Sequence, residues 1–321
     1  MKLFISLLIA LAGCSHKPTQ STTSSTTSTA PQEMPLPFLK ECSQIRVIDS
    51  NNWLLTCQKP PHEDRTEIYE WSLENQKLKR LTYQDGQIWD IMPIDSEHFY
   101  YSSSYDEFKE QFASILSGAK PGSDIYLKDL THTDFHRITS TKGLEISLFW
   151  EPQTKKLYFI HEGDTQSEIM TLDRRHKLKT LYKTSHRPIR NPIYIPKSHQ
   201  LYWLEYESID KRPDIRMMDA KGNLTTLYHS ESKIFQISLS PNGQQLMVGF
   251  VTGLGVEIWS LHLEDNCWRL AYRSTEPISE FYMLDDQTLF LTIRNSLKKD
   301  SLLPSSEICY PSPPALGVQT L

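Results

Sequence analysis

The stretch SLSPNGQQLMVGF, from Ser238 to Phe250, carries the pattern from which the fold can be predicted. Two apolar segments flank Pro241-Asn242-Gly243, residue types that start and close tight turns between hairpin strands. A second pair of short segments follows, EIWSLHL from Glu257 and CWRLAY from Cys267, separated by another polar turn. This order predicts four short antiparallel strands in succession.

The same unit recurs along the chain, and the third strand of each copy opens with an acid followed by Ile. The copies with their partner strands are EIYEWSL from Glu67 with KLKRLT, DIYLKDL from Asp124 with FHRIT, EIMTLD from Glu168 with KLKTLY, DIRMMD from Asp214 with NLTTLY, and EIWSLHL with CWRLAY. Successive copies start 57, 44, 46 and 43 residues apart. A period in the low forties with four strands per unit is typical of a β-propeller. An aromatic content of 11% suits such short, half-buried strands.

We expect an all-β, six-bladed propeller of four-stranded antiparallel blades. The first blade spans 44–82, and blades two to five continue to Arg273. Residues 276–294 give the inner hairpin of the sixth blade, and Glu307-Ile308-Cys309-Tyr310 looks like a degraded copy of its third strand. Because a ring must close its last edge, we expect the segment around Leu36 to Lys40 to complete blade six.

The N-terminal segment MKLFISLLIALAGCSH has the layout of an export signal. Lys2 gives it a positive start, and the apolar stretch from Leu3 to Leu11 is shorter than the ~20 residues of a membrane span. Leu11-Ala12-Gly13-Cys14 resembles the lipobox of bacterial lipoproteins, which implies cleavage after residue 13 and acylation of Cys14. Two or three acyl chains are enough for stable anchoring. An ordinary secretory signal that happens to contain a cysteine is the alternative.

Four regions are therefore expected. Residues 1–13 are the signal peptide, and residues 14–34 comprise the lipidated Cys14 and a Ser/Thr-rich tether with too few apolar residues to fold. The reach of such a random coil is roughly 25 Å. Residues 35–311 form the propeller domain, and residues 312–321 form a C-terminal tail. No second apolar run approaches membrane length, so the lipid is the predicted membrane attachment.

Four further cysteines follow Cys14, without the CxxC spacing of a structural zinc site: Cys42, Cys57, Cys267 and Cys309. Four thiols allow three pairings. We predict a disulfide between Cys42 and Cys309, because the expected outer strand of blade six would bring them together across the seam of the ring. Cys42 with Cys57 is the rival pairing, and buried free thiols are a third interpretation.

The longest departure from the period is YDEFKEQFASILSGAKPGS, from Tyr105 to Ser123. Its apolar residues Phe108, Phe112, Ile115 and Leu116 fall at i, i+4, i+7 and i+8, which predicts an amphipathic helix inserted over one face of the ring. Such a helix either packs there as a lid or contacts a partner, since insertions in repeat proteins often lie on the binding face.

Motifs for catalysis or cofactor binding are missing from the sequence. It contains no GxSxG, GxGxxG or GxxxxGK[ST] string. The clusters at His62 and His161 lack the second histidine of HExxH, and His132 and His136 flank a turn. The acid before each Ile is expected to accept hydrogen bonds from a neighbouring turn. We therefore predict no catalytic residue, no cofactor and no metal. The net charge of −5, with interspersed signs, argues against nucleic acid as a partner.

The order SPNG, strand, acid-Ile-aromatic, then RLT or TLY resembles the repeats of TolB-like propellers, a six-bladed family whose repeats read SPDG and DIYxxDL. The likeness covers residues 44–310, and Asn242 stands where that family has Asp. This resemblance implies a docking scaffold. Together with the lipobox, it predicts a monomeric envelope lipoprotein whose propeller binds an envelope protein or a peptidoglycan-associated partner.

Ser15 follows the lipobox cysteine at the position where Asp would signal inner-membrane retention. The resemblance to bacterial lipoproteins therefore implies the outer membrane, with the propeller facing the periplasm or the cell surface. A function of another class stays open beside the scaffold: a propeller hydrolase or lyase that acts on a small or glycan substrate in the central channel. Fold resemblance alone does not decide between them.

Overall fold

A computed structural model of the protein describes residues 33–34, 42–49, 51–59, 62–84, 86–105, 122–208, 211–293, 296–303 and 308–313. The chain divides into two units, Met1–Ala30 and Pro31–Leu321, and all of the described residues belong to the second. The predicted signal peptide, Cys14, the tether up to residue 32 and the segment from Leu36 to Lys40 lie outside the described residues. So does the predicted helix, except for Tyr105 and the residues from 122 onward.

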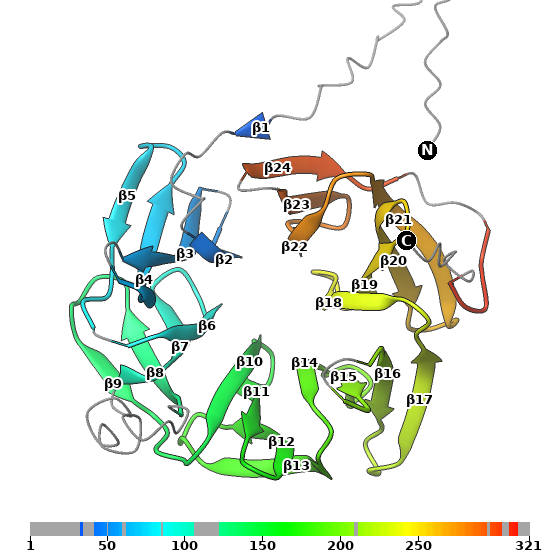
Figure 1. Ribbon diagram of the computed structural model, residues 1–321, viewed down its shortest axis with the longest axis horizontal. Helices are drawn as coiled ribbons and strands as arrows, with labels where there is room; N and C mark the ends of the chain where they lie inside the picture. Colours follow the sequence, from blue (N-terminus) through cyan, green and yellow to red (C-terminus); the bar gives the residue numbers. More distant parts are fainter. Residues whose placement is uncertain are drawn as a thin grey trace, which may run out of the picture. The chain divides into compact units, whose positions relative to one another are not determined.

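The unit Pro31–Leu321 is a propeller of six four-stranded antiparallel sheets, which confirms the predicted fold class (Figure 1). The strands of blades one to three are β2 (Cys42–Val47), β3 (Asn52–Lys59), β4 (His62–Ser72), β5 (Lys77–Arg80), β6 (Ile88–Pro93), β7 (His98–Ser103), β8 (Asp124–Asp129), β9 (Phe135–Arg137), β10 (Leu144–Glu151), β11 (Lys156–Glu162), β12 (Gln166–Leu172) and β13 (Leu178–Ser185). Those of blades four to six are β14 (Ile189–Ile195), β15 (Gln200–Tyr206), β16 (Pro213–Met218), β17 (Leu224–His229), β18 (Lys233–Leu239), β19 (Gln245–Thr252), β20 (Gly255–His262), β21 (Cys267–Ser274), β22 (Ile278–Met283), β23 (Thr288–Ile293), β24 (Ser296–Ser301) and β1 (Glu33–Met34).

The first strand of each blade lies nearest the middle of the ring, and the fourth lies at the rim (Figure 1). The core of the described part lies between the blades, in six clusters of buried apolar side chains that each join two neighbours. The second strands are consequently buried on both faces: Leu246, Met247, Val248 and Phe250 of β19 are all inaccessible to solvent. A helix of sufficient length and apolarity to cross a membrane is not found in the described part of the chain.

Blade six closes the ring with strands from both ends of the chain. Its sheet has the order β1-β24-β23-β22, and Glu33 and Met34 of β1 pair with Lys298 and Leu297 of β24. The sequence analysis expected the segment around Leu36 to Lys40 to supply the outer strand, but the strand observed is Glu33–Met34, two residues that it had placed in the tether. The third strand differs from the prediction: it is β24, which pairs antiparallel with β23 from Ser296 onward, so the segment ending at Tyr310 does not belong to blade six.

The segment that ends at Tyr310 instead returns to the outer edge of blade five. Tyr310 forms an antiparallel bridge with Trp268 of β21, with two backbone hydrogen bonds of 3.0 Å. Its ring also packs edge-on against Trp259, with the ring centroids 5.6 Å apart. The end of the described chain therefore covers the rim edge of a finished blade.

The cysteine pairing predicted between Cys42 and Cys309 is corrected by the structure, which joins Cys42 to Cys57 and Cys267 to Cys309. Cys42 and Cys57 are direct partners in the ladder between β2 and β3, with Cα atoms 3.8 Å apart. Cys309 is placed beside Cys267 because its segment follows the edge of β21, and their Cα atoms are 5.3 Å apart. The rival pairing considered for Cys42 is thus the one observed.

Candidate functional site

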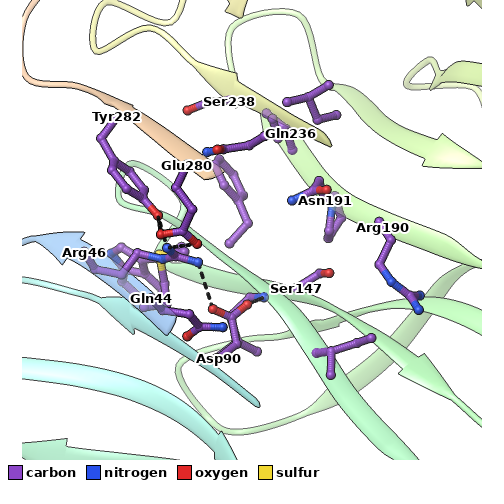
Figure 2. A pocket seen from close by; sticks show the side chains of 18 of the residues that line it. Gln44, Arg46, Asp90, Ser147, Arg190, Asn191, Gln236, Ser238, Glu280 and Tyr282 are labelled. Carbon is purple, nitrogen blue, oxygen red and sulfur yellow. Dashed lines mark hydrogen bonds and ion pairs between the residues drawn. The ribbon is translucent and has the colours of Figure 1, made fainter. Parts of the chain in front are cut away.

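The candidate site is a cavity of about 720 Å³ in the middle of the ring, lined by residues of all six innermost strands (Figure 2). Each of these strands, β2, β6, β10, β14, β18 and β22, carries a β-bulge where it pairs with the second strand of its blade. A bulge inserts an extra residue and turns a side chain out of the regular alternation. The innermost strand of every blade therefore has a β-bulge that faces the cavity.

At or directly after each bulge stands one polar residue, and together these residues form a set that we call the channel ring: Gln44, Asp90, Ser147, Asn191, Gln236 and Glu280. All six line the cavity. They occupy equivalent positions in successive blades, so the repeat that builds the fold also builds a belt of hydrogen-bonding side chains around the channel.

Four members of the channel ring bind the main chain of the next blade. Gln44 Nε2 donates to Trp89 O at 2.7 Å, and Asp90 Oδ2 accepts from Leu148 N at 2.7 Å. Gln236 makes two bonds with Phe281, of 2.9 and 3.0 Å. Glu280 Oε2 accepts from Ile45 N at 3.2 Å, across the seam between blades six and one. These four side chains connect neighbouring blades at the wall of the cavity.

Ser147 and Asn191 depart from this pattern. Both have a left-handed backbone, with φ of 56° and 53°, a conformation that Asn adopts more readily than most residues and Ser seldom adopts. Their side chains are short, and neither has a hydrogen-bond partner among the described residues. Blades three and four consequently present unengaged polar groups to the cavity.

The opposite side of the cavity holds a charged cluster around Arg46 (Figure 2). Its guanidinium binds Asp90 Oδ1 at 3.0 Å and Glu280 Oε1 at 3.4 Å, contacts the hydroxyl of Tyr282, and donates to Ile91 O at 3.1 Å. Burial raises the pKa of Asp90 despite the neighbouring charge of Arg46, and burial likewise raises the pKa of Tyr282. The cluster thus fixes three blades together with one cation and two carboxyl groups.

A second ion pair lies where the innermost strands begin. Arg190 Nη1 binds Glu162, and both side chains line the cavity while 27% and 21% exposed. Five charged residues line the cavity in total, and the two arginines pair with the three acids. The charged groups of the site are therefore engaged with one another.

The recurrent acid before Ile has the structural role predicted for it in blades one and two. Glu67 accepts from Gln84 N at 3.4 Å, and Asp124 accepts from Thr141 N at 3.2 Å, both in the segment that follows the fourth strand. The sequence analysis missed the partner of this acid. Each acid meets an Arg, Lys or His of the same blade at 2.5 to 3.3 Å, in the pairs Glu67–Arg80, Asp124–Arg137, Glu168–Lys183, Asp214–His229 and Glu257–Arg273.

The histidines examined in the sequence do not converge on a metal site in the described residues, where no group of three or more metal-ligating side chains occurs. His132 bonds Asp129 at 2.8 Å in the turn between β8 and β9. The sequence analysis also missed the channel ring. Its signal was present in phase in the quoted segments, as the polar residue two positions after Ile in IWD, IFQ and ISE.

Comparison with known protein families and with curated proteins finds no match. Solved structures with the same fold include TolB from Acinetobacter baumannii, with a TM-score of 0.57 and 17% identity over 82% of this chain and 65% of that chain. A puromycin hydrolase aligns with a TM-score of 0.55 and 11% identity, over 78% of this chain and 43% of that one. A chain of the nidogen–laminin complex aligns with a TM-score of 0.54 and 12% identity, over 75% of this chain and 85% of that one.

At these identities the comparisons show the propeller fold alone. The chain spans less than two thirds of the TolB chain and less than half of the puromycin hydrolase chain.

Proposed function

We propose that this chain is an envelope lipoprotein, anchored through Cys14, whose propeller is a scaffold that binds a protein or a cell-wall component through the central channel. The observation that carries the proposal is the cavity itself. It brings polar and apolar side chains of all six blades together around one space of a size that ligand-binding sites have.

The arrangement of the carboxyl groups favours binding over catalysis. Asp90 and Glu280 are both bonded to Arg46 and to main-chain N–H groups, and Glu162 is bonded to Arg190. Groups held in this way position the walls of a site. The fold that the chain shares with TolB and with a chain of the nidogen–laminin complex, a complex of two proteins, supports a binding role.

The test is photo-crosslinking in intact envelopes of the producing organism. The full-length protein carries p-benzoylphenylalanine in place of Ser238, which lines the cavity. The matched control carries it in place of Asn266, which is exposed in the turn between β20 and β21. We expect an adduct from position 238 that is absent from position 266.

The absence of an adduct at position 238, or the same adducts from both positions, would contradict a channel-based binding function. Recovery of the protein outside the envelope fraction would contradict the anchored location.

A further inference from the structure

The hydrogen-bonding capacity left free in the cavity is neutral. The charged side chains are paired with one another, as described above. Ser147, Asn191 and Ser238 line the cavity, and their side chains have no hydrogen-bond partner among the described residues. Gln44 Oε1 is buried there without a partner. An anionic ligand would find no free cation, because both arginines are paired, whereas hydroxyl and amide groups would find both donors and acceptors.

Four of the innermost strands have a main-chain donor next to the bulge that is already occupied. The N–H groups of Ile45, Ile91, Leu148 and Phe281 donate to side chains of the channel ring. At the equivalent position of blade four stands Pro192, which has no N–H. An extended peptide that added to these strands would need those donors. At five of the six walls, the main-chain position next to the bulge therefore offers no free N–H donor to a peptide.

Aromatic side chains contribute to the apolar part of the wall, beside aliphatic ones. Phe149 and Phe235 line the cavity. Phe235 lies directly against the backbone of Gly249: a Cβ atom at that glycine would come within 2.4 Å of the Phe235 ring. Phe235 also packs edge-on against Phe281, with centroids 5.9 Å apart. These contacts fix the ring as a rigid surface beside the free polar groups.

We propose that the channel binds an uncharged oligosaccharide, with Ser147 and Asn191 bonding its hydroxyl or acetamido groups and the aromatic side chains of the wall contacting its sugar rings. Sugars combine neutral hydroxyl groups with apolar ring faces, which is the combination that the cavity presents. Its volume of about 720 Å³ lies within the range of small-molecule sites. The inference rests on the proposed function and favours a cell-wall component over a protein as the ligand.

The test is titration calorimetry on the mature full chain in detergent, with maltotriose, cellotriose and triacetylchitotriose as neutral probes. Trigalacturonate serves as the charged probe, and the capped peptide acetyl-(Ala-Gly)₃-amide serves as the peptide probe. We expect at least one neutral trisaccharide to bind with a Kd of about 1 mM or tighter.

The variants used for the test are glycine substitutions at residues with a left-handed backbone. Gly tolerates φ near +55°, so the double variant Ser147→Gly, Asn191→Gly removes both polar groups without straining the fold. Asn266→Gly makes the same kind of change at φ 53° in a turn outside the cavity lining. Circular dichroism of both variants checks that they fold. The double variant should bind at least about tenfold more weakly, as expected for two lost hydrogen bonds, and Asn266→Gly should bind like the parent.

The inference is overturned if no neutral trisaccharide binds, if the double variant binds as tightly as the parent, or if only trigalacturonate or the peptide binds. A crosslink from position 238 in envelopes would in those cases leave the proposed binding function standing and remove only the ligand class.

Discussion

The pKa of the Glu145 carboxyl is set by its buried surroundings. Its side chain is inaccessible to solvent at the start of β10 and accepts hydrogen bonds from the hydroxyls of Thr139 and Thr141. Burial raises the pKa of this carboxyl to about 7, the hydroxyl bonds oppose that rise, and the nearby charge of Asp124 adds to it. Asp124 itself is neutralised by Arg137.

Because the pKa of Glu145 is raised in the folded state, we predict that the unfolding free energy of the protein depends on pH. In the unfolded chain Glu145 has the ordinary pKa near 4.5, so between that value and about 7 the folded state binds the proton more tightly. Its contribution is fully present below about pH 4.5 and is lost as the pH rises through about 7. Relative to Glu145→Gln, the parent should lose up to about 3 kcal/mol of unfolding free energy between pH 5 and pH 8. Urea unfolding at the two pH values measures this difference.

The comparison with Glu145→Gln is needed because burial lowers the pKa of the neighbouring His161, which destabilises the fold at acid pH in both proteins. Glu264→Gln, at a glutamate side chain that is 76% exposed, is the matched control and should follow the parent at every pH. Parallel curves for the parent and Glu145→Gln would show that Glu145 does not hold its proton in the folded state.

Arg46 gives a second prediction at the residue scale. Arg46→Met leaves the carboxyl groups of Asp90 and Glu280, 7% and 20% exposed, without their cation. Removing one partner of a buried ion pair is strongly destabilising, so we expect a loss of about 3 kcal/mol in urea unfolding at pH 7. The loss should shrink at acid pH, because burial raises the pKa of the Asp90 carboxyl, and a protonated Asp90 does not need the cation.

Arg190→Met is the matched variant for this experiment, since Arg190 also lines the cavity but pairs with a single, partly exposed acid. Its loss should stay below about 1 kcal/mol. Equal losses for the two arginines would refute the central role assigned to the Arg46 cluster.

At the scale of the elements, blade six is held in the ring by strand pairing, by side-chain packing and by a disulfide. β1 contributes only Glu33 and Met34 to blade six, and the seam is reinforced by Trp53 against Phe290, with centroids 5.3 Å apart. The disulfide between Cys267 and Cys309 encloses β22, β23 and β24, and so holds the last blade against the fifth.

This disulfide should contribute more stability than the other. The chain-entropy relation gives about 4 kcal/mol for the 42-residue separation of Cys267 and Cys309 and about 3 kcal/mol for the 15 residues between Cys42 and Cys57. We expect the pair Cys267→Ala, Cys309→Ala to lose more unfolding free energy than the pair Cys42→Ala, Cys57→Ala, measured by urea unfolding without reductant. The reverse order, or no loss in either variant, would contradict the prediction.

At the scale of the whole molecule, the fold could be predicted because its signal repeats. The acid-Ile strands from Glu67 to Glu257 are in phase, and each blade repeats the same pairings, so errors in one copy do not change the prediction. Blade six could not be predicted in detail, because β24 reads SLKKDS and lacks the acid-Ile pattern. The cysteine pairing failed with it, since it depended on placing Cys309 in that blade.

The cavity could be predicted only in part. A ring of blades implies a channel, but the channel ring depends on bulges at Asp90 and its equivalents, and a bulge shifts side chains in a way that strand alternation does not reveal. The unengaged state of Ser147 and Asn191 depends on their left-handed backbone, for which neither residue type is a sufficient signal.

The last prediction concerns the anchor. If Cys14 is the acylated residue, then Cys14→Ser removes the site of lipidation, and no other segment of the sequence is apolar enough to span a bilayer. We expect the parent to partition into the detergent phase after Triton X-114 extraction, and the variant to be found uncut or released into the aqueous phase. Ser15→Ala, one residue further along, is the matched control and should partition like the parent. A Cys14→Ser protein that is processed and enters the detergent phase as the parent does would refute the lipid anchor, and with it the tethered location on which the proposed envelope function depends.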